Sequence, residues 1–159
     1  MAIGRTTLLF FDASCLIAAA GSPSGGSGFL LSLCAMGFLS AVVSQLVLIE
    51  AERHVFRDLG PAALEHYDQI LAQTPMRVMP VPTEDELAPH RGLVSQEDEH
   101  VIASAIASGA GFLVTLDKRL ARQVTETQFA IAALAPGDFI TGLLPQHAEY
   151  PAMRNPREA

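Results

Sequence analysis

The chain has 159 residues, with 10 Lys and Arg against 17 Asp and Glu, so its formal net charge at pH 7 is −7. This length predicts one domain, and an apolar content of 50% excludes a disordered chain. An acidic chain does not attract nucleic acid through general electrostatics, because the phosphate backbone selects basic surfaces. Residues 13–49 contain no charged side chain, but Ser, Gly and Gln interrupt them. Buried elements of an α/β domain are therefore expected there, and no membrane span.

The two cysteines, Cys15 and Cys34, lie in apolar surroundings. Two cysteines are too few for a disulfide framework or an iron–sulfur cluster, so we expect a buried, reduced pair in a cytoplasmic protein. The absence of Trp and the presence of only 2 Tyr disfavour an aromatic stacking platform for single strands.

The first half of the sequence predicts strands that alternate with helices. An apolar run at residues 6–11 predicts a buried strand that ends at Asp12, and a second strand is expected at residues 38–43. Ser44 is a favourable N-cap for a helix that runs to residue 59, and Pro61 suits the first turn of the next helix. Further helices are expected at residues 16–20, 28–36 and 61–72, with a Gly/Ser loop at 21–28.

The second half continues this alternation. Thr83 and Glu86 have capping-box spacing for a short helix, and Asp98 opens a helix that ends before Gly109. Strands are expected at residues 76–81, 112–115 and 129–134, with helices at 118–125 and after Pro136. The pattern predicts an α/β fold of three layers, α/β/α, around a central, mostly parallel sheet. We expect residues 1–144 to form this domain and residues 145–159, which are polar and Pro-rich, to form a flexible tail.

Four acidic residues stand at informative places in this pattern. Asp12 and Asp117 follow predicted strands, at the edge of an open α/β sheet where ligands bind. Asp98 begins the apolar face of its helix, and Glu50 has apolar residues at i−3 and i−4, so both are expected to face inward.

Inward carboxylates need a cation, because an unpaired buried charge is costly. Each acid has a simpler interpretation alone: Asp12 and Asp98 as helix caps, Glu50 paired with Arg53, Asp117 in a turn. Together, in a chain with few bases, the four favour a site for Mg²⁺ or Mn²⁺, which prefer oxygen ligands. Paired divalent ions can clamp a phosphodiester and activate water.

Five segments in this order resemble the motifs of one family: residues 8–14, 44–50, 98–105, 109–118 and 136–139. The chain resembles PIN-domain ribonucleases, above all the VapC-like toxins of bacterial toxin–antitoxin pairs. The resemblance implies metal-dependent cleavage of RNA that leaves 5′-phosphate and 3′-hydroxyl ends. It implies that Asp12, Asp98 and Asp117 hold the metal, while Glu50 ligates it or orients the attacking water.

The resemblance also places other side chains near the expected site. The hydroxyls of Ser14 and Thr115 lie where they could hold a carboxylate or a water. The candidates for contacting RNA phosphates are Lys118, Arg119, Arg122, Arg53 and Arg57.

The sequence departs from the family at one position and leaves other functions open. Family members carry a further acid just after the fourth motif, where Lys118, Arg119 and Ala121 stand here. A PIN-like domain that binds a protein partner without catalysis is therefore one alternative, and a metal-dependent hydrolase of small phosphate esters is another. The apolar surfaces of the helices at 45–59 and 61–72 suggest a homodimer or a groove filled by an antitoxin.

Overall fold

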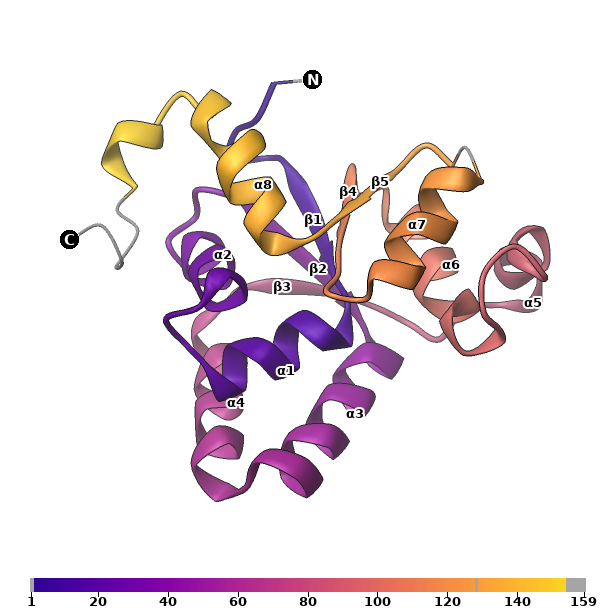
Figure 1. The fold of residues 1–159 in the computed structure, drawn as a ribbon, viewed down its shortest axis with the longest axis horizontal. Helices are drawn as coiled ribbons and strands as arrows, with labels where there is room; N and C mark the ends of the chain where they lie inside the picture. The colour runs from indigo at the N-terminus through magenta and orange to yellow at the C-terminus, as the bar shows by residue number, and fades with distance from the viewer. Residues whose placement is uncertain (1, 128, 154–159) are drawn as a thin grey trace.

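A parallel β-sheet forms the centre of the molecule (Figure 1). The computed structural model describes residues 2–127 and 129–153. In this part of the chain the sheet has five strands in the order β3-β2-β1-β4-β5, all paired in parallel. The strands are β1 (Leu8–Phe11), β2 (Ser40–Ser44), β3 (Met76–Met79), β4 (Phe112–Val114) and β5 (Ala132–Leu134). The predicted α/β class and parallel sheet are confirmed.

Helices cover both faces of the sheet (Figure 1). They are α1 (Ala13–Gly21), α2 (Gly26–Ala35), α3 (Gln45–His54), α4 (Pro61–Gln73), α5 (Glu84–Leu87), α6 (Glu99–Ser108), α7 (Lys118–Glu126) and α8 (Pro136–Gly142). Right-handed crossovers place α1 to α4 on one face, because β1, β2 and β3 follow one another in one direction across the sheet. The chain then returns past β1 to β4 and β5, so α5, α6 and α7 cover the other face.

The reversal of strand order creates a switch point between β1 and β4. From β1 the chain moves towards β2, whereas β4 lies on the other side of β1. Phe11 pairs with Val114, so both strands end at the same level. The crevice outside the carboxyl ends of such strands is where open α/β sheets bind ligands. The fold therefore directs attention to Asp12 and to the residues after Val114.

Several strands are shorter than the apolar runs that predict them. Phe38 does not join β2; its ring packs against His147 at a centroid distance of 6.3 Å. Phe129 lies outside β5 and packs against His90 at 4.8 Å. The hydrophobicity of both residues reflects burial in loops, because apolar side chains need cover whether or not their backbone pairs.

Residues 145–153, which are expected to belong to a flexible tail, contact the domain in the structure. Residues 154–159 of the expected tail lie outside the described residues. Arg5 forms a bidentate pair with Glu149, with both N–O distances 2.7 Å. His147 is buried and donates from Nε2 to the carbonyl of Phe38 at 2.7 Å. Met153 is also buried. These contacts dock residues 145–153 beside the beginning of β1.

Two predictions about membrane and redox context can be compared with the fold. Cys15 and Cys34 are free and buried, as expected. Burial raises the pKa of both thiols to about 12, so neither is a thiolate nucleophile at neutral pH. Among the described helices, none combines the length and hydropathy required to cross a bilayer.

Ser44 caps α3 as its sequence position predicts. Its Oγ accepts a hydrogen bond from the N–H of Val47 at 3.1 Å, inside the buried junction of β2 and α3. We expect Ser44→Ala to lower the free energy of unfolding by about 1 to 2 kcal/mol, because loss of the cap leaves the buried N–H of Val47 unpaired. Urea denaturation measures this, with Thr83→Ala at the cap of exposed α5 as the comparison. An equal effect of both variants would contradict a role for burial.

Candidate metal and catalytic site

Asp12 is held by two hydroxyl groups at the end of β1. Its side chain is only 8% exposed. Oδ2 accepts hydrogen bonds from Ser14 Oγ at 2.9 Å and from Thr115 Oγ1 at 2.8 Å. Ser14 Oγ in turn accepts from the N–H of Leu116 at 3.0 Å. This network joins the end of β1 to the loop after β4 and fixes the direction of the Asp12 carboxylate.

Asp117 is oriented by the helix that follows it. Its Oδ1 accepts from the backbone N–H groups of Arg119 and Leu120, at 2.9 and 3.1 Å, and so caps α7. Its own N–H donates to Thr115 Oγ1 at 3.0 Å. Thr115 therefore bridges Asp117 and Asp12, and a helix N-terminus stabilises the negative charge of Asp117.

Asp98 lies at the start of α6, where that helix reaches the same edge of the sheet. Its side chain is 16% exposed, and its Oδ2 is buried without a hydrogen-bond partner. Burial, together with the negative charges of Asp117 and Asp12, raises the pKa of the Asp98 carboxyl to about 6. The nearest cation is Arg119, whose Nη2 lies 3.9 Å from Oδ2, and its charge only partly opposes this rise.

The three aspartates share a pattern that fits a cation. Asp12 Oδ2 and Asp117 Oδ1 each accept hydrogen bonds from protein groups. Within the described ranges, Asp12 Oδ1 and Asp117 Oδ2 accept none. Asp98 contributes a buried oxygen without a partner. Oxygen donors of this kind suit Mg²⁺ or Mn²⁺. Within residues 2–127 and 129–153, however, no three His, Cys, Asp or Glu side chains are already arranged around a common point.

Glu50 does not face inward as expected. It is exposed, because the buried stripe of α3 runs through Val47 and Ala51, continues at Val55 in the turn after the helix, and leaves Glu50 at its margin. Glu50 also forms no ion pair with Arg53 in the part of the chain described. The expectation of four inward carboxylates is therefore wrong at this position.

His100 is a neighbour of the site to which the sequence gives little weight. Burial lowers the pKa of this imidazole, while the negative charges of Glu50 and Asp12 act in the opposite direction. Its Nδ1 is buried without a hydrogen-bond partner. A single His two residues after Asp98 forms no distinctive motif. Its place in the site is therefore recognised only from its proximity to Glu50 and Asp12 in the structure.

The basic candidates are all on the surface. Lys118, Arg122 and Arg53 are exposed and form no ion pair among the described residues. Arg119 is different, because it pairs with Glu97 at 3.0 Å and lies near Asp98. Arg57 pairs with Asp58 at 3.0 Å. Arg119 and Lys118, which follow Asp117 directly, are therefore the bases nearest to the site.

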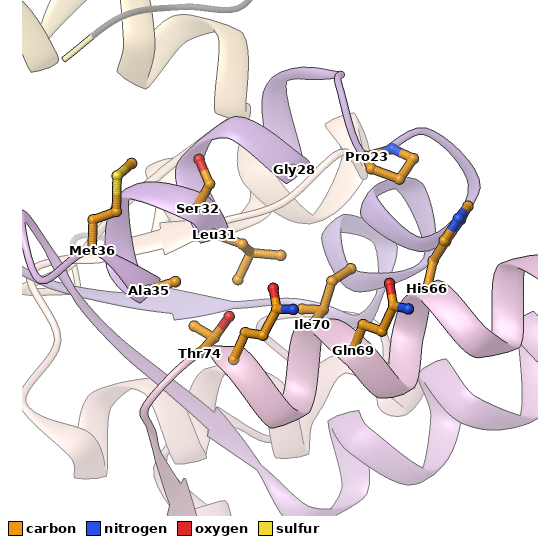
Figure 2. A pocket seen from close by; sticks show the side chains of 11 residues that line it. Pro23, Gly28, Leu31, Ser32, Ala35, Met36, His66, Gln69, Ile70 and Thr74 are labelled. Atoms are coloured by element: carbon orange, nitrogen blue, oxygen red, sulfur yellow. The ribbon is translucent and has the colours of Figure 1, made fainter.

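A separate cavity of about 520 Å³ lies between α2 and α4 (Figure 2). Its apolar lining includes Leu31, Met36 and Ile70, and its α4 side carries His66 and Gln69. None of the described residues that line it is acidic. This groove is thus distinct from the site of the three aspartates.

Thr115→Val tests the hydroxyl that bridges Asp12 and Asp117. We expect the RNA cleavage that the sequence resemblance implies to fall by about 10- to 100-fold, because groups that orient metal-binding carboxylates typically contribute that much. Steady-state cleavage assays measure the effect. Thr125→Val is the matched control, since exposed Thr125 bonds through Oγ1 to the carbonyl of Ala121, its one partner among the described residues. Equal activity of both variants would contradict the bridging role.

With the fold and site described, the chain can be compared with known proteins. A model of the PIN domain matches residues 9–119, a span that includes Asp12, Glu50, Asp98 and Asp117. This span is more than half of the chain, and the protein belongs to the PIN-domain family. No functionally curated protein matches it significantly in sequence.

Solved structures share the fold at low sequence identity. PAE2754 from Pyrobaculum aerophilum is 24% identical, with a TM-score of 0.54, over 81% of this chain and 84% of that one. VapBC2 from Rickettsia felis, bound to a DNA fragment from its promoter, is 15% identical, with a TM-score of 0.58, over 80% and 98%. Mycobacterium tuberculosis VapC20, a toxin that cleaves the sarcin–ricin loop, is 20% identical, with a TM-score of 0.54, over 78% and 98%. VapC toxins of VapBC systems are therefore among the structural neighbours.

Proposed function

We propose that this PIN-domain protein is a Mg²⁺- or Mn²⁺-dependent endoribonuclease in which Asp12, Asp98 and Asp117 hold the metal. The buried, unpartnered Oδ2 of Asp98 beside two further carboxylates is the observation that carries the proposal. Three negative groups with one cation at 3.9 Å leave excess charge, and a divalent ion would neutralise it. The two oxygens left free on Asp12 and Asp117 support the same assignment.

The residues of the chain have separate roles in this reaction. A bound divalent ion supplies Lewis-acid activation of the phosphodiester and of water. Ser14 and Thr115 hold Asp12, and the start of α7 holds Asp117, so these carboxylates need little reorganisation. Glu50, exposed at the rim beside His100, fits a role in orienting water better than that of a buried ligand. In this proposal Lys118 and Arg119 contact flanking phosphates, and Arg53 and Arg122 contact more distant ones.

Metal-dependent cleavage of RNA by the purified protein tests this function. We expect a single-stranded RNA to be cut with Mn²⁺ and to stay intact with EDTA. Matched DNA and a panel of small phosphate esters identify the substrate class. Hydrolysis of the esters without cleavage of RNA would replace the proposal with a small-phosphate hydrolase. Mn²⁺ binding without hydrolysis of any substrate would favour a domain without catalysis.

We further propose that the ribonuclease is the toxin of a toxin–antitoxin pair and acts in the cytoplasm. The similarity of the fold to VapBC2 and VapC20 supports this role, and the free buried cysteines fit a reducing compartment. Co-expression with the product of an adjacent small reading frame tests it. A stable complex that no longer cleaves RNA is expected, and full activity of the mixture would contradict the pairing.

The exposed apolar surface of α3 and the turn after it supports a homodimer. Ile49 is 52% exposed and Phe56 is 71% exposed, beside Leu64. Contiguous apolar side chains of this size usually mark a protein interface. Light scattering of the protein and of Phe56→Glu tests the proposal, which expects a dimer that the substitution converts to a monomer. A monomer at every concentration would overturn it.

A further inference from the structure

A small cavity next to the three aspartates has no role in the reaction as described so far. Its volume is about 200 Å³, and its lining comes from α1, the turn before α2, the loop after β4 and the start of α8. Leu116 forms one wall, between Thr115 and Asp117 in sequence. Ala18 forms another, one turn beyond Ser14 on the same face of α1. The cavity therefore adjoins the network that holds Asp12.

The chemistry of the lining suits a flat heterocycle with polar edges. Leu116 is 47% exposed, an apolar side chain at an otherwise polar edge of the sheet. Ser27 is 95% buried and lines the cavity, and its hydroxyl lies beside a thiol. Its neighbour is the Cys15 thiol, a weak partner that already donates to the carbonyl of Val114 at 3.4 Å.

Backbone N–H groups at the start of α2, beside the cavity, favour a base with acceptor atoms. The N-cap of α2 is Gly25, which has no side chain to accept from the first N–H groups of the helix. Gly26 and Ser27 carry such groups and line the cavity. Bases that present two acceptors on one edge, as guanine does through N7 and O6, fit this arrangement best.

We propose that this cavity binds one base of the RNA, beside the phosphate held at the aspartates, and so sets the base preference of cleavage. The inference rests on the proposed ribonuclease function and deepens it. Single-stranded RNA is commonly recognised through bases that leave the stack and enter protein pockets. Here the small residues Ala18, Gly26 and Gly137 leave the space, so the absence of Trp and the scarcity of Tyr do not prevent base recognition.

The two glycines of α8 provide matched variants. A Cβ added at Gly137, which lines the cavity, meets no atom within 4 Å, and the same holds for Gly142 at the other end of the helix. Gly137→Leu therefore adds a large apolar side chain at the edge of the cavity without a clash at Cβ, and Gly142→Leu is the control. The assay compares the cleavage rates of four oligonucleotides that differ only in the base beside the cleaved linkage. We expect Gly137→Leu to reduce the ratio between the fastest and the slowest rate by about tenfold. Gly142→Leu should keep the wild-type preference.

A binding measurement separates this inference from the activity itself. Methyl NMR with EDTA present records whether the Leu116 signals shift when each of four RNA dinucleotides is added. We expect shifts in the wild type and in Gly142→Leu, greatest for a guanine-containing dinucleotide, and their loss in Gly137→Leu. If the wild type cleaves no RNA, the ribonuclease proposal fails and the methyl shifts alone decide the inference. Unshifted Leu116 signals, or equal base preference in both variants, would overturn it.

Discussion

Asp12→Asn lowers RNA cleavage by about 10³-fold in this account, while the fold remains intact. The amide keeps the shape of the side chain but removes one negative charge from the proposed metal site. A 10³-fold lower rate corresponds to the loss of roughly 4 kcal/mol of transition-state stabilisation. A metal ion contributes a stabilisation of this order. Single-turnover cleavage with saturating Mn²⁺ measures it directly.

Two controls make the Asp12 result specific. Circular dichroism checks that Asp12→Asn is folded, because Ser14 and Thr115 can still bond the remaining carbonyl oxygen. Asp68→Asn, at an exposed position of α4 that takes no part in the network around Asp12, should cleave RNA at the wild-type rate. Wild-type activity in Asp12→Asn would refute the catalytic assignment, and equal losses in both variants would indicate a nonspecific effect.

Asp98→Asn should stabilise the metal-free protein at pH 7 to 8. A rise of the Asp98 pKa from 3.8 to about 6 corresponds to at most about 3 kcal/mol that the folded state loses when this carboxyl ionises. The neutral amide removes that cost, so the midpoint of urea unfolding in EDTA should increase. Asp85→Asn is the matched control, because Asp85 is exposed at the start of α5 and is not among the charges that raise the pKa of Asp98.

The pH dependence of this difference follows from the direction of the pKa change. The folded state binds the Asp98 proton more tightly than the unfolded chain, so stability is lost as the pH rises from about 4 through about 6. The advantage of Asp98→Asn should therefore be full above pH 7 and nearly absent at pH 4. A constant difference across this range would show that charge at Asp98 is not its cause.

The sequence identifies the fold well because local and global signals agree. Asp12 and Asp117 follow buried strands, and the caps at Ser44 and Thr83 form as their spacing predicts. Strand ends are less certain from sequence, since Phe38 and Phe129 have the hydrophobicity of strand residues but pack against histidines in loops. Hydrophobicity indicates burial and does not specify backbone pairing.

Orientation on helices accounts for what the sequence misses in the site. Glu50 has apolar neighbours one turn earlier, yet the stripe of α3 that packs inward is narrow and excludes it. The bond from Thr115 to Asp12 joins residues 103 positions apart, and only the parallel pairing of β1 and β4 brings them together. The unpartnered oxygen of Asp98 likewise depends on how α6 meets this edge, which no local pattern encodes.

Calorimetric titration of Mn²⁺ into the wild type and Asp98→Asn is the most direct test of the proposed metal site. We expect saturable binding at sub-millimolar concentration in the wild type, with affinity reduced at least about tenfold in Asp98→Asn. Removal of one charged ligand whose Oδ2 has no hydrogen-bond partner among the described residues should have this effect. Absence of Mn²⁺ binding by the wild type at millimolar concentration, or equal affinity of the two proteins, would contradict the account.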